Sequence, residues 1–210
     1  MNPNKFKKLY QHYVNHFGAS EEPKIFHPNT PQGMPHIDVI RIMPTADRPF
    51  QVLATIGASD IKLKRVHGDL SSRNEYVTFL PADWDEKELP WVMNLLMATA
   101  VYPAVTGEDV SYSHTLDMAD GFLARFQGDD FNMIGAGLLF PEACESTDVL
   151  RCRTGLLEIV TILHMMPLTR AEMNKIIARR EKGEPDWSDM FYPEDDEAFG
   201  KMPFLCARKR

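Results

Sequence analysis

Two histidines at helical spacing are the first candidates for chemistry in this sequence. His12 and His16 are four residues apart in a segment with helical periodicity, so both imidazoles would lie on one helix face, where they could bind a metal ion. The glutamate of an H-E-x-x-H motif does not stand beside them, and the sequence offers no obvious third ligand. We therefore predict solvated helix histidines here and no metal site.

A third histidine, His164, ends the apolar run "ILH" and could serve as a general base. A base needs a nucleophile within reach, and no serine or cysteine occurs in a recognisable setting with a histidine. Ser59 follows a strand-like run in "IGASD", but Ile61 occupies the second glycine position of a G-x-S-x-G motif. His164 is therefore expected to be a structural or edge-exposed histidine.

Nucleotide-binding and glycosidase patterns fail as well. The segment "GAGLLF" has Phe140 where a dinucleotide fingerprint needs its third glycine. The acids at 129–130 and 194–197 are typical of solvated turns, and the sequence cannot place them as a catalytic pair. We predict no catalytic residue and no cofactor. The alternative that stays open is an enzyme or metal-binding protein that uses histidines and nearby acids, and its candidates are His12, His16, His114 and His164.

The charge balance narrows the class of partner. The chain has 30 acidic and 23 basic residues, for a formal net charge of -7. Nucleic-acid-binding proteins usually carry a basic surplus or stripe, so we predict no nucleic-acid partner. An acidic protein is better suited to a basic protein partner, because complementary fields speed encounter. The same charge also suits simple solubility, and that alternative stays open.

Cysteine use and hydropathy predict a cytoplasmic protein. The three cysteines, Cys144, Cys152 and Cys206, are widely spaced and odd in number, which is typical of reduced intracellular thiols. The lysines near the start of the chain are not followed by the apolar block of a secretory signal. No apolar run approaches the roughly 18 residues of a membrane helix, so no membrane contact is expected.

Hydrophobic periodicity predicts helices over 4–17, 83–102 and 170–182. The second is apolar on nearly all sides and is expected to be deeply buried. Thr169 and Glu172 match the T-x-x-E capping box that starts the third. Short runs rich in β-branched residues predict the strands between them. These strands are expected at 37–43, 50–56, 75–80, near 110–114, 121–127, 133–140 and 155–165.

These elements predict a single α/β domain with a central mixed sheet and helices packed on it. Direct hairpins between the early strands exclude a wholly parallel sheet. Residues 1–36 are expected to form an N-terminal helix and an irregular connection, and residues 37–182 the main domain. Residues 183–210 are expected to form an acidic and aromatic tail packed on the same domain.

The order of these features resembles the suppressor-of-fused-like domain family over about residues 37–182. That family has a G-x-S after a strand, an acid that opens E-h-x-x-x-L-P (h, hydrophobic), and a last strand that runs into a P-h-T-x-x-E helix. The chain has the matching residues in the same order, namely Gly57, Ser59, Glu75, Leu80, Pro81, Pro167, Thr169 and Glu172.

The resemblance implies a protein-binding module without catalysis. Animal members sequester transcription factors by gripping an extended peptide, with a second domain that this chain is expected to lack. Bacterial members look like immunity proteins that neutralise toxins. In the animal pattern, a tyrosine that ends the tryptophan-containing helix and an acid after the next glycine contact the peptide. These positions resemble Tyr102 and Glu108, although the family commonly has Asp at the second.

We therefore predict an immunity or sequestering protein that covers the working site of a protein partner, such as a toxin, a basic protein or an extended peptide. Aromatic side chains supply contact area and acids supply orientation. The predicted contact residues are Tyr102, Glu108, Asp109, Tyr112, Trp187, Phe191 and Tyr192. Two alternatives stay open: a domain that only scaffolds an assembly, and a Tyr102 that packs beside a solvated Glu108.

Overall fold

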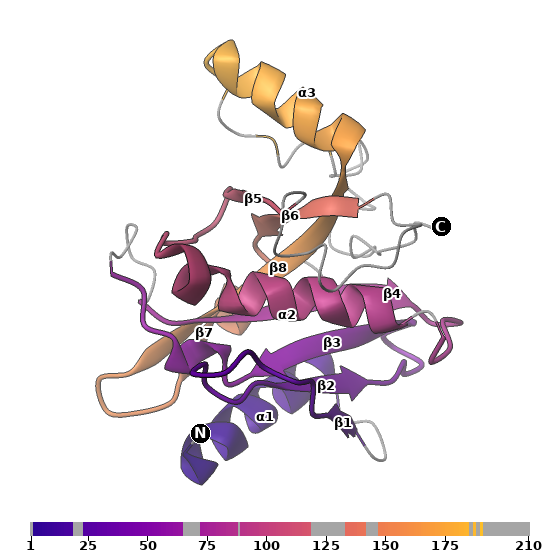
Figure 1. Cartoon of the computed structure of the whole chain (residues 1–210). Helices are drawn as coiled ribbons and strands as arrows, with labels where there is room; N and C mark the ends of the chain where they lie inside the picture. Colours follow the sequence, from indigo (N-terminus) through magenta and orange to yellow (C-terminus); the bar gives the residue numbers. More distant parts are fainter. Residues whose placement is uncertain are drawn as a thin grey trace.

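The computed structural model describes residues 2–18, 23–64, 72–87, 89–118, 133–141 and 147–184, together with residues 187 and 190 (Figure 1). Within these residues the chain forms three α-helices and one eight-stranded sheet. The helices are α1 (Pro3–Phe17), α2 (Leu89–Thr106) and α3 (Arg170–Glu181), with short 3-10 turns η1 (Ala58–Asp60) and η3 (Thr147–Leu150). The strands are β1 (Lys24–Phe26), β2 (Asp38–Ile42), β3 (Phe50–Ile56), β4 (Asn74–Pro81), β5 (Thr115–Asp117), β6 (Met133–Leu139), β7 (Arg151–Arg153) and β8 (Ile159–Thr169).

The sheet is mixed, as the sequence predicts. Its strand order is β1-β2-β3-β4-β8-β6-β5, and β7 pairs with β8 beside this path. The central pair β4 and β8 is parallel, and the other pairs are antiparallel. The parallel pair joins two halves of the chain, because Asn74 lies opposite Thr161 and Val77 opposite His164.

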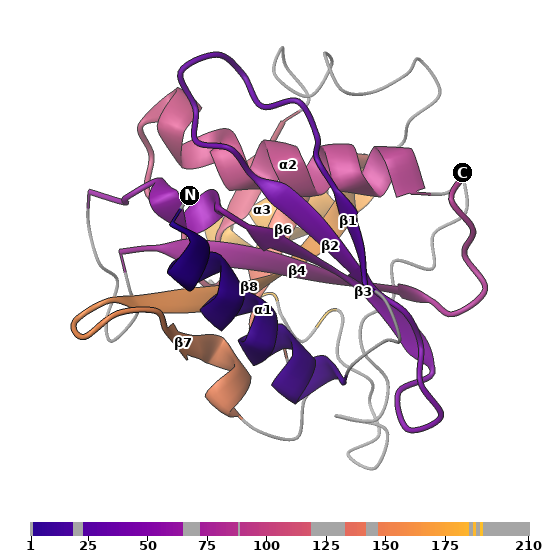
Figure 2. The ribbon, with the colours of Figure 1, turned by 90° about the horizontal axis from the view of Figure 1, so that it is seen from below.

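The two faces of the sheet are covered by different helices, and Figure 2 shows α1 and α2 on opposite sides of it. Successive strand residues point to opposite faces, so each central strand supplies apolar side chains to both. In β3, Leu53 packs on the α2 side, whereas Val52 and Ala54 pack on the α1 side. The four central strands β2, β3, β4 and β8 are therefore buried in nearly every position, as is typical of a sheet covered on both faces.

A third buried cluster lies where α3 meets the far ends of β6 and β8. It contains Leu139, Met166, Leu168, Met173, Ile176 and Trp187. Trp187 is fully buried, and its indole Nε1 donates a hydrogen bond to the carbonyl of Ser113 at 2.9 Å. A β-carbon on Gly137 would overlap this indole. Glycine at 137 therefore makes room for a tryptophan fifty residues later in the chain.

Several predicted boundaries need correction. Residues 110–114 form a turn region, and the strand begins at Thr115. Residues 155–158 form the turn between β7 and β8, so the long strand starts at Ile159. Helix α2 begins at Leu89 and not at residue 83, because residues 82–83 and 86–87 form turns. It continues past Pro103 and ends before Gly107, whose positive φ of 74° suits a residue without a β-carbon. Strands β1 and β7 were missed because three-residue strands carry little periodicity.

The other elements match their predictions. Helix α1 covers the predicted segment, and both hydrogen bonds of the Thr169–Glu172 capping box are present at the start of α3. The strand expected at 121–127 lies outside the described residues. Helix α2 is long and apolar enough to cross a membrane, but 61% of that window is buried against the rest of the protein. The packing therefore identifies α2 as a core helix of this fold.

Candidate functional site

The end of α2 and the loop after it place the predicted contact residues on one surface. The Tyr102 hydroxyl donates a hydrogen bond of 2.9 Å to the Glu108 carboxylate. Glu108 is exposed, whereas Tyr102 is half-buried because its side chain packs against the core cluster under α2. Thr106 fixes the loop between them, since its hydroxyl accepts from the Glu108 amide at 3.2 Å. Val105 lies beside the pair and is 45% exposed. A tyrosine, a carboxylate and an exposed valine therefore share the C-terminal end of α2.

Asp109 has a different role in the same loop. Its Oδ1 accepts a hydrogen bond from the backbone amide of Lys64 at 2.7 Å, and the Lys64 Nζ donates to the carbonyl of Gly107 at 3.3 Å. Asp109 therefore ties two surface loops together. Sequence reasoning missed Lys64 because 45 residues separate it from Asp109, and no local pattern reports such a contact.

Tyr112 lies between this loop and the core. Its ring stacks on Phe140 with a centroid distance of 4.0 Å and an interplanar angle of 5°. The following residue, Ser113, has a positive φ of 63°, and its carbonyl accepts from both Arg180 and Trp187. Tyr112 is half-buried by these neighbours, so it presents only part of its ring to a partner.

The predicted contact residues in the tail behave differently. Trp187 is buried in the third cluster and its indole N–H is used inside the fold, so we leave it out of the proposed surface. Phe191 and Tyr192 lie outside the described residues. Of the seven predicted residues, the structure therefore groups Tyr102, Glu108, Asp109 and Tyr112 around one loop.

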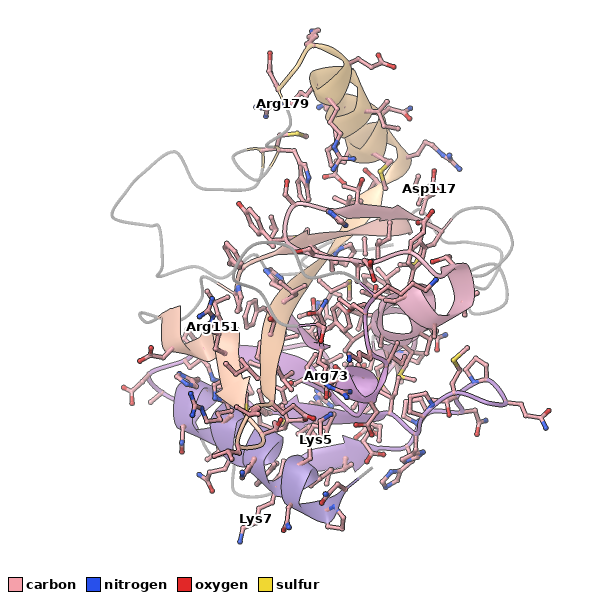
Figure 3. All side chains as sticks on the ribbon, turned by 90° about the vertical axis from the view of Figure 1, so that its left-hand side faces the viewer. Lys5, Lys7, Arg73, Asp117, Arg151 and Arg179 are labelled. Atoms are coloured by element: carbon pink, nitrogen blue, oxygen red, sulfur yellow. The ribbon has the colours of Figure 1, made fainter. Side chains whose placement is uncertain are left out.

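Tyr102 is half-buried and lies close to two carboxylates. Burial, followed by the hydrogen bond to Glu108, raises the pKa of Tyr102 to about 12, and Asp117 on β5 adds to the effect. Figure 3 shows Asp117 at the α3 end of the molecule, far from the labelled Lys5. The Tyr102 hydroxyl therefore stays protonated at neutral pH and can donate a hydrogen bond beside two carboxylates.

A buried carboxylate organises the turn that follows β3. Glu75 is fully buried, and its two oxygens accept hydrogen bonds from the Thr55 hydroxyl at 2.7 Å and the Ser59 hydroxyl at 2.6 Å. They also accept from the backbone amides of Gly57, Ala58 and Ser59 at 2.9, 3.3 and 3.0 Å. Burial raises the pKa of Glu75, and these hydrogen bonds act in the opposite direction. This carboxylate is a structural anchor.

The same turn is also held from outside the core. Lys5 of α1 pairs with Asp60 at 2.7 Å and with Glu158 at 3.3 Å. Arg73 donates to the Ser59 carbonyl at 2.6 Å and pairs with Glu158 at 3.5 Å; Figure 3 labels both cations. Helix α1, the turn after β3 and the β7–β8 turn are therefore joined by one charged network.

The histidines of the catalytic alternative lie in separate places. His164 is buried in the sheet with its ring 4.7 Å from that of Phe79. His12 and His16 are adjacent on α1, with ring centroids 4.5 Å apart, and His12 Nε2 lies 2.9 Å from the Val149 carbonyl. In the part of the chain that the structure describes, none of the candidate histidines belongs to a group of three metal-ligating side chains.

The buried His164 makes the stability of the protein depend on pH. Burial lowers the pKa of His164 from 6.5 to about 3, so the unfolded chain takes up a proton that the folded protein excludes between these values. Stability from this residue is complete above about pH 6.5 and falls below it by up to about 1.4 kcal/mol per pH unit. Urea unfolding between about pH 6 and 4 should show that the free energy of unfolding falls less steeply with pH for His164→Gln than for the wild type. If this free energy falls in parallel for the two proteins, the burial effect is contradicted.

A family model for the suppressor of fused protein matches residues 33–184. A search of curated proteins finds no match. Solved structures share the fold at low sequence identity. A protein from Neisseria gonorrhoeae that is named as a suppressor of fused homologue aligns with a TM-score of 0.61 and 12% identity, covering 100% of this chain and 97% of that one.

Two further solved structures have the same fold. The Sufu–Fu complex aligns with a TM-score of 0.58 and 14% identity over 85% of this chain and 81% of the matched chain. Drosophila Suppressor of Fused aligns with a TM-score of 0.53 and 16% identity over 81% of this chain but only 42% of that one. The family match covers strands β2 to β8, α2 and α3, together with the loop that carries Tyr102 and Glu108, but not β1.

Proposed function

The chain belongs to the suppressor of fused family, and from this premise we propose that it is a protein-binding module that acts by covering a partner protein rather than by catalysis. One of the similar structures is itself a complex, Sufu–Fu, which supports a protein as the ligand. The finer proposal is an immunity or sequestering protein of the cytoplasm whose partner is a toxin, a basic protein or an extended peptide.

The observation that carries this proposal is the hydrogen-bonded pair of the half-buried Tyr102 and the exposed Glu108 at the end of α2. Tyrosine offers a large contact area with few rotatable bonds, so it loses little entropy when a partner immobilises it. The Glu108 carboxylate is exposed and retains acceptor capacity beyond the single Tyr102 bond. A lysine, an arginine or the backbone N–H of an extended peptide could therefore bind here.

Electrostatics supports a basic partner. Two carboxylates, Glu108 and Asp117, act on the Tyr102 hydroxyl, and the Lys64 ammonium at the Gly107 carbonyl is the cation beside this loop. The net charge of -7 extends this preference to the whole chain. A field of this sign raises the association rate of a basic partner and slows that of an acidic one. Occlusion needs no moving part, and α2 is held firmly because it packs along the sheet.

We expect charge reversal at Glu108 to weaken partner binding by about tenfold or more, because a lysine would meet the basic group that the carboxylate receives. The variant Glu108→Lys should fold normally, since the Glu108 side chain is exposed. A pull-down from a lysate of the native host, with the wild-type protein as bait, recovers the partner. The affinity of this partner is then measured for the wild type and for each variant. Asp109→Lys is a poorer choice, because Asp109 also holds the Lys64 loop.

Asp83→Lys is the matched control. It makes the same change of charge at an exposed position that precedes the other end of α2, an 18-residue helix about 27 Å long. Binding that survives Asp83→Lys and fails with Glu108→Lys supports the surface. If the wild type, Asp83→Lys and Glu108→Lys bind the partner with equal affinity, the partner binds elsewhere. If a toxin encoded beside this gene kills cells that coexpress the protein, the immunity proposal fails although the binding surface can still hold.

A further inference from the structure

Two histidines and an aspartate meet at the β1–β2 edge of the sheet. His27 Nδ1 and His36 Nε2 each lie 2.7 Å from the same oxygen of Asp38. One ligand atom from each of the three residues lies within 4.8 Å of the others. The imidazole rings are nearly stacked, with centroids 5.9 Å apart and an interplanar angle of 23°.

Strand pairing explains why these three side chains share one face. Strands β1 and β2 are antiparallel with Phe26 opposite Val39, so the next residue along, His27, comes opposite Asp38. His36 and Asp38 are two residues apart in an extended segment, and side chains at this spacing point the same way. The sequence places His27 and His36 nine residues apart without a metal-binding motif, so only the register brings them together.

The backbone that carries His36 is held in place. A β-carbon on Gly57 would overlap the carbonyl of His36, so the two backbones are in close contact there. The Gly57 amide is in turn bound by the buried Glu75 carboxylate. Asp38 has only 8% of its side chain exposed, whereas His27 and His36 are 66% and 54% exposed. The carboxylate is thus anchored and both imidazoles are open to solvent.

We propose that His27, His36 and Asp38 form a binding site for a divalent transition-metal ion of the Zn²⁺ type. Two imidazole nitrogens and one carboxylate oxygen are typical ligands of Zn²⁺, and solvent would occupy the fourth position of a tetrahedral site. Ligand atoms about 2.0–2.1 Å from such an ion lie about 3.3 Å from one another, so small side-chain rotations from the present positions are enough. Nitrogen ligands disfavour Ca²⁺ and Mg²⁺, which prefer oxygen.

Metal binding here would replace the two histidine–aspartate hydrogen bonds with coordinate bonds. Each ligating nitrogen gives up its proton, either to the other nitrogen of the same ring or to solvent, because only an unprotonated nitrogen donates its lone pair to the ion. The ion would then join β1 to β2 through side chains. Strand β1 has three residues and, among the strands that the structure describes, pairs only with β2, so this link would hold it on the sheet (Figure 2).

Zinc titration of the untagged, metal-stripped full chain tests the proposal. We expect one Zn²⁺ per chain by calorimetry and by elemental analysis after dialysis, and no comparable binding of Mg²⁺. His27→Ala and His36→Ala should each weaken Zn²⁺ binding by more than about tenfold, since each removes one of three ligands. Both side chains are mostly exposed, so neither substitution is expected to unfold the protein. Hydrogen exchange at residues 24–26 should slow when Zn²⁺ is added.

A variant with His12→Ala and His16→Ala is the matched control, because it removes the other close histidine pair. Binding that persists in this control and is lost in the His27 and His36 variants supports the site. The proposal is overturned if the wild type binds no stoichiometric Zn²⁺. It is equally overturned if the His27 and His36 variants bind like the wild type, or if the control alone loses the metal.

Discussion

Replacing Glu75 with alanine is expected to lower the free energy of unfolding by about 4 kcal/mol, a large part of the stability of a typical domain. The substitution removes the acceptor of five buried hydrogen bonds. Three of the donors are backbone amides, which cannot turn away, and each buried donor left without an acceptor costs roughly 1–3 kcal/mol. Urea unfolding of the wild type and Glu75→Ala gives the difference.

Three further variants make this test specific. Glu75→Gln keeps the size and one oxygen, but its amide nitrogen would face donors, so we expect an intermediate loss of about 2 kcal/mol. Ser59→Ala removes a single donor and should cost about 1 kcal/mol. Glu158→Ala is the control for losing a carboxylate at a partly exposed ion pair, with an expected cost within about 1 kcal/mol. If Glu75→Ala is no worse than Glu158→Ala, Glu75 is not the anchor of this turn.

Truncation of Trp187 to alanine is expected to destabilise the protein by about 3–5 kcal/mol, as for other fully buried large side chains. The loss combines the cavity in the third cluster with the broken hydrogen bond to Ser113. Gly137→Ala should cost about 2 kcal/mol by itself, because its methyl group would overlap the indole. Thermal or urea unfolding of each variant measures these losses.

The double variant decides whether the two residues touch. In the Trp187→Ala background, the cavity accepts the added methyl group, so Gly137→Ala should become nearly neutral. The expected coupling between the two positions is therefore about 2 kcal/mol. Losses that simply add would show that the indole does not lie over Gly137, and would return Trp187 to the surface where the sequence alone had placed it.

Much of the local structure follows from the sequence. Each of these local signals depends on residues that are close together in the chain. Examples are the apolar periodicity of residues 4–17, the β-branched runs of β2, β3 and β4, and the capping box at Thr169. The family resemblance could also be recognised in the sequence, because Gly57, Ser59 and Glu75 occur in the order that the family has. The physical reason for that order could not be predicted, since the pattern does not show that the Glu75 carboxylate binds the amides of the turn.

The candidate site was predicted in part. Tyr102, Glu108 and Asp109 lie within seven residues, so their grouping could be expected from the resemblance and the helix end. Two of the predicted contact residues have other roles in the structure. Asp109 accepts a hydrogen bond from the backbone amide of Lys64, and Trp187 is buried. An aromatic residue in an acidic tail has the same composition whether it faces solvent or a core, so composition could not separate these cases.

By itself the sequence determined the fold class and the main elements, because periodicity and capping act over short distances. The family came from the resemblance in the order of its motifs. The tertiary structure alone decided which strands pair in parallel and which histidines lie beside an aspartate. It also showed that the Glu75 carboxylate accepts the buried hydrogen bonds of a turn and that Gly137 leaves space for the Trp187 ring. These features join residues that are distant in the chain or opposed across strands. Hydrophobic pattern shows that a strand face is buried, but the register against its partner strand decides which side chains come into contact.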